Sequence, residues 1–94
     1  MPIVRRDRPR RVPPADVEAV RRWAARRPGM QAVVGDEAIT IGADPPVARL
    51  RWRGWAGDWT LERRAGTRWA SWPGAAPTPD IRSLLALVAR REQR

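Results

Sequence analysis

The 94-residue chain contains no cysteine, histidine, lysine, tyrosine, phenylalanine or asparagine. Without cysteine it can form neither a disulfide framework nor a thiolate nucleophile. Because histidine is also absent, the usual zinc sites and the serine–histidine and cysteine–histidine catalytic pairs are excluded. The lack of lysine and tyrosine removes a Schiff base and a phenolic acid. Carboxylates, guanidinium groups and a few hydroxyls remain, so the sequence predicts a protein that is not an enzyme and uses no metal or cofactor.

Long apolar runs are also lacking. No segment approaches the roughly 20 residues that a membrane span needs, and residues 1–6 lack the apolar core of a secretory signal. We therefore expect a soluble cytoplasmic protein with no membrane contact. Alanine accounts for much of the apolar content, so the six tryptophans must fill much of the core. Each fully buried aromatic side chain contributes roughly 2–3 kcal/mol of transfer free energy.

Basic charge is abundant and comes from arginine alone. The chain has 19 basic and ten acidic residues, which gives a net charge of +9. The sign alternates along the chain: residues 1–12 sum to +4, residues 30–46 to −3 and residues 47–72 to +4. This excess favours an anionic partner, either a nucleic acid or an acidic protein.

Hydrophobic periodicity predicts an α+β fold with an N-terminal helix, a five-stranded antiparallel meander sheet and a C-terminal helix packed on one face. Residues 1–12 are expected to form a flexible basic arm and residues 13–94 a single domain. Apolar residues at helical spacing predict the first helix over residues 14–27. The second helix is expected to run to about residue 92, with Thr78 as its N-cap and Pro79 at its first helical position.

The strands are predicted from residues that alternate between apolar and polar. A hairpin is expected over residues 31–42, followed by strands over residues 47–54, 58–63 and 67–72. If the central hairpin is symmetric about residues 55 and 56, one face carries the pairs Trp52–Trp59 and Leu50–Leu61. The other face then carries Arg53–Asp58, Arg51–Thr60 and Arg49–Glu62. Both faces are chemically consistent in this one register, which favours it.

The register of the last strand depends on the turn that precedes it, at Ala65-Gly66. A two-residue turn places Trp72 beside Trp59 in the core and leaves Trp69 on the arginine side. A three-residue turn reverses the two tryptophans. Both registers remain open at this point.

Several segments resemble a bacterial family of small proteins that is catalogued as domain of unknown function 3024. The segments are Val-Ala-Arg-Leu-Arg-Trp at residues 47–52, Trp-Thr-Leu at 59–61, Gly-Thr-Arg-Trp at 66–69, and Asp80 with Leu84-Leu85. The resemblance covers roughly residues 37–88, although the chain lacks the Phe-Trp tail with which that family usually ends. It implies an α+β architecture and no activity, because the family is uncharacterised.

The first candidate binding site is a ladder of arginines on the central strand, Arg49, Arg51 and Arg53. Such positions lie about 6.5–7 Å apart per step, close to the phosphate spacing of an extended nucleic-acid strand. A guanidinium group matches phosphate oxygens with its planar fork of donors. The neighbouring candidates are Arg64, Arg68 and the turn residue Trp55. In the alternative interpretation, Glu62 and Asp58 neutralise the ladder and the face is only solvated.

The second candidate site is the N-terminal arm, whose basic residues are Arg5, Arg6, Arg8, Arg10 and Arg11. Flexible basic arms follow phosphates or enter a DNA groove. A solubilising tail that binds nothing explains the same composition.

The third candidate is a set of carboxylates, Asp36, Glu37 and Asp44. Paired carboxylates serve acid–base catalysis or hold Mg²⁺. At turn positions they are far more often ordinary turn residues, so we assign them no catalytic role.

Two functions follow from these sites. The first is non-catalytic, sequence-nonspecific binding of DNA or RNA by the arginine-rich sheet face and the arm. The alternative is a protein-interaction module, such as an inhibitor, antitoxin or adaptor, that docks on an acidic partner through arginines and Trp55.

Overall fold

The computed structural model describes residues 11–42 and 46–92, and within them it contains two helices and five strands. In chain order these are α1 (Pro14–Ala25), β1 (Gln31–Val34), β2 (Ala38–Gly42), β3 (Pro46–Arg53), β4 (Asp58–Ala65), β5 (Arg68–Ser71) and α2 (Ile81–Glu92). The strands form one antiparallel sheet in the order β1-β2-β3-β4-β5. The predicted α+β meander is therefore confirmed.

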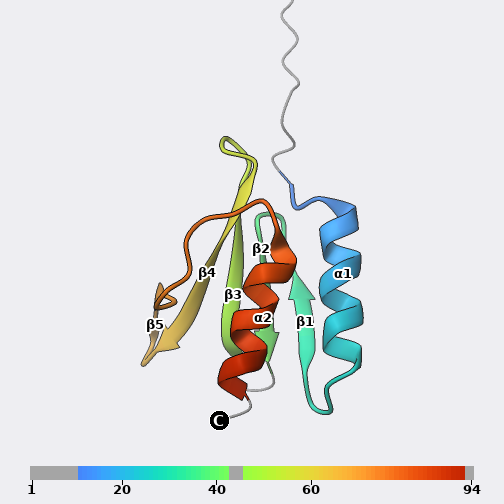
Figure 1. Ribbon diagram of the computed structural model, residues 1–94, viewed down its shortest axis with the longest axis vertical. Coiled ribbons are helices and arrows are strands. Elements are labelled where there is room, and N and C mark those ends of the chain that lie inside the picture. Colours follow the sequence, from blue (N-terminus) through green and yellow to red (C-terminus); the bar gives the residue numbers. More distant parts are fainter. Residues whose placement is uncertain (1–10, 43–45, 93–94) are drawn as a thin grey trace, which may run out of the picture.

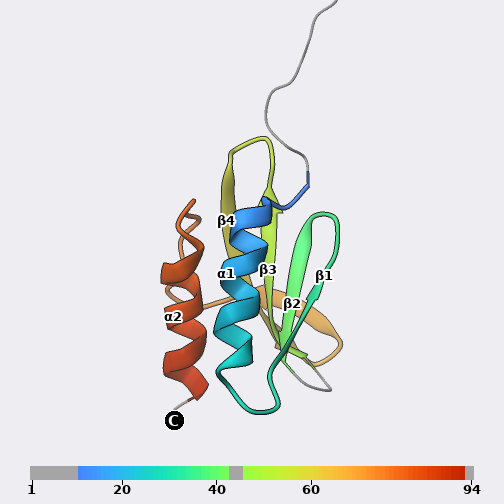
Figure 2. The same cartoon turned by 90° about the vertical axis from the view of Figure 1, so that its right-hand side faces the viewer.

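Both helices cover the same face of the sheet, so the molecule has two layers (Figure 1). The view turned by 90° shows α1 and α2 on one side of the strands, and within residues 11–42 and 46–92 no helix or strand covers the other side (Figure 2). The two helices run in the same direction, and both end near the same end of the molecule (Figure 1). We call the uncovered side, which carries Arg49, Arg51 and Arg53 of β3, the open face.

The core lies between the helices and the sheet. The largest fully buried side chains are Trp59, Ile39, Ile41 and Leu50 from the sheet, Val20 from α1, and Leu84 and Val88 from α2. On β3 and β4 the apolar residues alternate with charged ones, because successive side chains of a strand point to opposite faces. The pattern that predicted the strands therefore also selects which face the helices cover.

Trp59 connects three parts of the fold. Its ring is fully buried and its indole N–H donates a hydrogen bond to Oδ2 of Asp16 on α1, with a donor–acceptor distance of 2.8 Å. Its backbone exchanges two hydrogen bonds with Thr78, at 2.8 and 3.0 Å. One residue of β4 thus holds the first helix and the segment that leads into the second.

The central hairpin has the predicted register. Trp52 pairs with Trp59, Leu50 with Leu61, Arg53 with Asp58, Arg51 with Thr60 and Arg49 with Glu62. The ring centroids of Trp52 and Trp59 lie 5.1 Å apart on the helix-covered face. The close aromatic pair favours this register, because shifting one strand by one residue would turn its tryptophan to the open face and separate the two rings.

The structure decides between the two registers of the last strand. Ala65 pairs with Arg68, so the turn consists of the two residues Gly66 and Thr67, and Gly66 adopts the left-handed conformation with φ of +66°. Trp72 is buried in the core and Trp69 faces the arginine side, as the two-residue turn predicts. Because the turn lies one residue later than expected, the amide of Trp72 bonds to Leu61, whereas the prediction placed Trp72 opposite Trp59.

The predicted N-cap of the second helix is wrong. Thr78 is held in an isolated bridge with Trp59, so it cannot start a helix. The cap is Asp80, whose Oδ1 accepts a hydrogen bond from the amide of Arg82 at 3.1 Å. Thr78 instead supports the cap, because its hydroxyl accepts a hydrogen bond from the amide of Asp80 at 3.0 Å.

Replacing Trp59 with phenylalanine tests the connection between α1 and the sheet. The variant keeps an aromatic ring but loses the indole donor and leaves Asp16 without it. We expect the free energy of unfolding to fall by about 1–3 kcal/mol, measured by urea denaturation. Asp16→Asn keeps an oxygen acceptor and should lose less. An unchanged urea midpoint in Trp59→Phe would contradict this role.

Candidate anion-binding surfaces

The arginine ladder lies on the open face, as predicted, but two of its three members are paired with acids. Nε of Arg49 lies 2.6 Å from Oε1 of Glu62. Arg53 donates two hydrogen bonds to Asp58, from Nε to Oδ1 at 2.7 Å and from Nη2 to Oδ2 at 2.8 Å. The ladder is therefore partly neutralised by residues directly opposite on β4.

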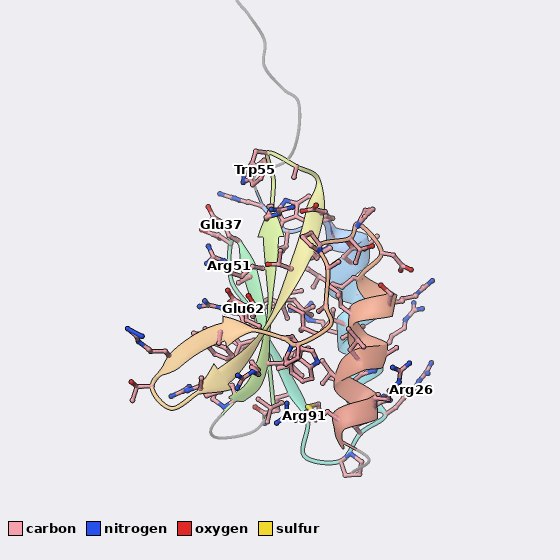
Figure 3. The ribbon with its side chains drawn as sticks, turned by 60° about the vertical axis from the view of Figure 1, so that its left-hand side comes forward. Arg26, Glu37, Arg51, Trp55, Glu62 and Arg91 are labelled. Carbon is pink, nitrogen blue, oxygen red and sulfur yellow. The ribbon has the colours of Figure 1, made fainter. Side chains whose placement is uncertain are left out.

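Arg51 is the exception at the centre of the ladder. Its cross-strand neighbours are Thr60 on β4 and Ala38 on β2, which carry no charge. Its side chain is exposed and projects from the side of the molecule away from the helices (Figure 3). Arg51 makes no ion pair with any residue that the structure describes. It is the cation of the ladder that can meet an anionic partner without first losing an acid.

The paired arginines also stack on tryptophans. The guanidinium carbon of Arg49 lies 4.8 Å from the ring centroid of Trp69, and that of Arg53 lies 4.6 Å from the centroid of Trp55. Each tryptophan is thus linked through one arginine to one carboxylate. We call Glu62–Arg49–Trp69 and Asp58–Arg53–Trp55 the two triads. A planar guanidinium makes both contacts at once, which an ammonium group does less well.

The two tryptophans differ in exposure. Trp55, at the tip of the β3–β4 hairpin, has 76% of its surface exposed (Figure 3). Trp69 is half-buried among the arginines, because Arg64 of the adjacent strand β4 also approaches its ring, with its guanidinium carbon 5.6 Å from the centroid. Sequence reasoning placed a tryptophan on the charged face but did not detect the stacking, which depends on side-chain conformation.

Not every predicted site residue joins the open face. Arg64 pairs with Trp69 and shares its face, and its Nε donates to the carbonyl of Gly66 at 2.8 Å. Arg68 pairs with Ala65, so strand alternation directs it to the opposite face from Arg64. Arg11 is exposed ahead of α1. The other arm candidates, Arg5, Arg6, Arg8 and Arg10, lie outside the described residues, as does most of the predicted arm.

The candidate carboxylates are ordinary turn residues where the structure describes them. Asp36 and Glu37 are exposed between β1 and β2, and the carbonyl of Asp36 accepts a hydrogen bond from the amide of Val12 at 3.1 Å. Asp44 lies outside the described residues. Within the described part of the chain, no group of three or more potential metal ligands comes together.

The arginine–aspartate pair at the hairpin is electrostatically tuned. The hydrogen bond from Arg53, aided by its positive charge, lowers the pKa of the Asp58 carboxyl below its ordinary value, although desolvation opposes the shift. The same hydrogen bond raises the pKa of Arg53. The pair stays ionised at neutral pH and holds the guanidinium in place beside Trp55.

The helix side carries cationic surfaces that sequence reasoning missed. A groove of about 510 Å³ between α1 and α2 has an apolar floor that includes Trp23 and Leu85. Its arginines are Arg22, Arg26, Arg27, Arg82 and Arg90. Figure 3 shows Arg26 on the helix side, opposite Arg51. The signal was present as arginines along both helices, but which of them face each other depends on helix packing.

No protein-family model matches the chain, and neither does a curated protein or a solved structure. The resemblance to domain of unknown function 3024 therefore stays a prediction. Among the described residues, no helix has the length and apolar character to cross a membrane.

The tuned pair predicts a pH-dependent contribution to stability. Because the pKa of Asp58 is lower in the folded protein than in the unfolded chain, its ionised form stabilises the fold above the ordinary aspartate pKa of about 3.9. That contribution is lost as the pH falls through the lowered value. Asp58→Asn should lower the melting temperature at pH 7, and the difference should close on acidification. A difference that persists unchanged to about pH 2 would argue against the pair as its source.

Proposed function

We propose that this protein is a non-catalytic, sequence-nonspecific nucleic-acid-binding protein whose open face holds a single strand of DNA or RNA. The observation that carries the proposal is the position of Arg51, an exposed cation without an acid partner among the described residues, between the two triads. A strand crossing the face would meet a phosphate-binding group at its centre and an aromatic ring on either side.

The charge of the open face supports an extended polyanion. The face carries Arg49, Arg51, Arg53 and Arg64 against the two paired acids Asp58 and Glu62, and the exposed Glu37 lies on the same side as Arg51 (Figure 3). Steps of about 6.5–7 Å along β3 are close to the phosphate spacing of an extended strand. The two acids reduce the attraction, so the face favours moderate, strongly salt-dependent affinity over tight binding.

The triads support stacking of bases. Bases of single strands stack on tryptophan rings and on guanidinium planes, and each such contact is worth about 1–3 kcal/mol. In each triad the carboxylate fixes the arginine and the arginine fixes one side of the ring. A ring that is already held in place loses less conformational entropy when a base stacks on it. Stacking also tolerates every base, in keeping with sequence-nonspecific binding.

One observation favours the alternative function. Trp55 is highly exposed at a hairpin tip. Arg53 lies over its ring and is itself held by two hydrogen bonds to Asp58. A rigid tryptophan beside an arginine is typical of a binding hot spot for a protein. An acidic partner protein would use Trp55 as the anchor and the arginines as a steering rim.

The double variant Arg51→Ala/Arg53→Ala tests the open face as the nucleic-acid site. It removes two cations and releases Asp58, so binding to single strands should weaken equally for all sequences. Each phosphate contact contributes about 0.7 to the slope of log affinity against log salt, so losing two contacts should lower that slope by roughly 1.4. Fluorescence titration with labelled oligonucleotides at several salt concentrations measures both.

The matched control is Arg26→Ala/Arg90→Ala, which removes the same charge from the helix side. The control should bind like the original chain. If instead the two double variants lose affinity to the same extent, the attraction is a property of total charge and the open face is not the site.

Trp69→Leu separates the two functions. A stacked base lost from Trp69 should weaken strand binding by about 1–3 kcal/mol, whereas docking of an acidic protein on the hairpin tip should depend on Trp55→Leu and not on Trp69. Binding to oligonucleotides and capture of copurifying proteins are measured for both variants. Strand affinity that Trp69→Leu leaves intact would contradict the proposed stacking.

A further inference from the structure

Arg63 occupies an unusual place on the helix-covered face. On β4 that face carries Trp59, Leu61 and then Arg63, which lies between Ala48 on β3 and Ala70 on β5. The two small neighbours leave room for the long side chain, but neither side chain offers it a hydrogen-bond acceptor. The arginine therefore enters the layer between sheet and helix without a partner from the adjacent strands.

Nε of Arg63 is buried and has no hydrogen-bond partner. Buried polar groups in folded proteins are nearly always hydrogen-bonded, and an unpaired buried charged donor is destabilising. Arg63 also makes no ion pair with a described residue. An acceptor at this point would remove the penalty.

A pocket of about 480 Å³ adjoins Arg63 where α2 ends. Its apolar walls come from Pro46, Val47, Trp72 and Val88, and Arg91 of α2 supplies a second guanidinium. The guanidinium carbon of Arg91 lies 5.5 Å from the ring centroid of Trp72. Arg64 also lines the pocket, but its Nε is bonded to Gly66. None of the described residues that line the pocket is acidic.

We propose that this pocket binds a phosphate monoester, with Arg63 and Arg91 holding the phosphate oxygens and the apolar walls receiving the organic group. Two guanidinium groups with no carboxylate among the described lining residues favour a dianion, and their forked donors match phosphate geometry. The volume lies within the usual range of about 300–1,000 Å³ for small-ligand sites. The phosphate can belong to a free nucleotide or to the end of a nucleic-acid strand.

The groove between α1 and α2 is a weaker candidate. Arg22 lies 3.5 Å from Glu18, and Arg27 donates to the carbonyl of Trp23 and covers its ring at 4.2 Å. Arg26 and Arg90 lie near helix C-terminal ends, where cations complement the helix dipole. Four of the five groove arginines thus have roles within the fold, and Arg91 shares the helix-end position, whereas Nε of Arg63 has no partner.

The test is isothermal titration calorimetry with adenosine 5′-monophosphate, adenosine and inorganic phosphate. We expect the monophosphate to bind and adenosine not to bind. Arg63→Gln and Arg91→Gln should each weaken binding at least tenfold, while Arg68→Gln, which changes the same charge outside the pocket, should leave it unchanged. Arg91 is exposed, so Arg91→Gln decides the question even if Arg63→Gln does not fold.

Thermal melting gives a second readout. Arg63→Leu removes the half-buried guanidinium whose Nε is buried without a partner, so its melting temperature without ligand should equal or exceed that of the original chain. Its stabilisation by the monophosphate should disappear. The double variant Asp44→Asn/Glu92→Gln is the check for an internal acid. If it melts at a lower temperature than the original chain, and if adding Arg63→Leu removes that difference, an acid of the chain itself fills the pocket and the proposal fails. It also fails if no phosphate compound binds, or if Arg63→Gln, Arg91→Gln and Arg68→Gln bind equally well.

Two oligonucleotides distinguish the sources of the phosphate. A strand end as the natural source predicts that a 5′-phosphorylated oligonucleotide binds more tightly than its 5′-hydroxyl counterpart, and that Arg63→Gln abolishes the difference. Equal binding of the two strands, together with binding of the monophosphate, assigns the pocket to a free nucleotide. Because Arg51→Ala/Arg53→Ala leaves the pocket intact, failure on the open face and failure here are separate results.

Discussion

The hydrogen bond between Trp59 and Asp16 is the contact on which the arrangement of the two layers depends. A tryptophan in this core needs a partner for its N–H, and the partner comes from the first turn of α1, 43 positions away. The same residue holds Thr78 through its backbone and so sets where the chain turns toward α2. The sheet could pair its strands without Trp59, but α1 and the segment before α2 would no longer be bonded to the same residue of β4.

The open face shows how a chain without lysine distributes its cations. Arg49 and Arg53 each contact one carboxylate and one aromatic ring. Much of the charge and many of the donors of these arginines are therefore already engaged within the molecule. Arg51 and Arg63 differ because the strands place uncharged residues beside them. The two proposed sites thus arise from the same circumstance on opposite faces of one sheet, namely an arginine whose cross-strand neighbours cannot neutralise it.

How much of this was predictable depends on the range of the interactions involved. The register of β3 and β4 followed from residues 47–63, because one pairing satisfies both faces. Trp69 and Trp72 could not be assigned, since the residues around Gly66 suit turns of two lengths. The prediction that Thr78 caps the second helix was wrong, because a bridge to Trp59 overrides the preference of threonine for the start of a helix. The pocket at Arg63 could not be foreseen, as it requires the position of α2 over β4.

The connectivity of the sheet has a consequence for the order in which the chain acquires its shape. Every strand pairs with its neighbour in sequence, and such local contacts form quickly once both strands exist. Helix α1 is different, because it leaves the ribosome early while its anchor on β4 follows 43 residues later. During synthesis, which proceeds at about 5–20 residues per second, Asp16 of α1 meets its donor only when Trp59 has emerged. The hydrogen bond that ties α1 to β4 therefore forms only after most of the sheet has been synthesised, whereas the packing of α1 on β1 can form earlier.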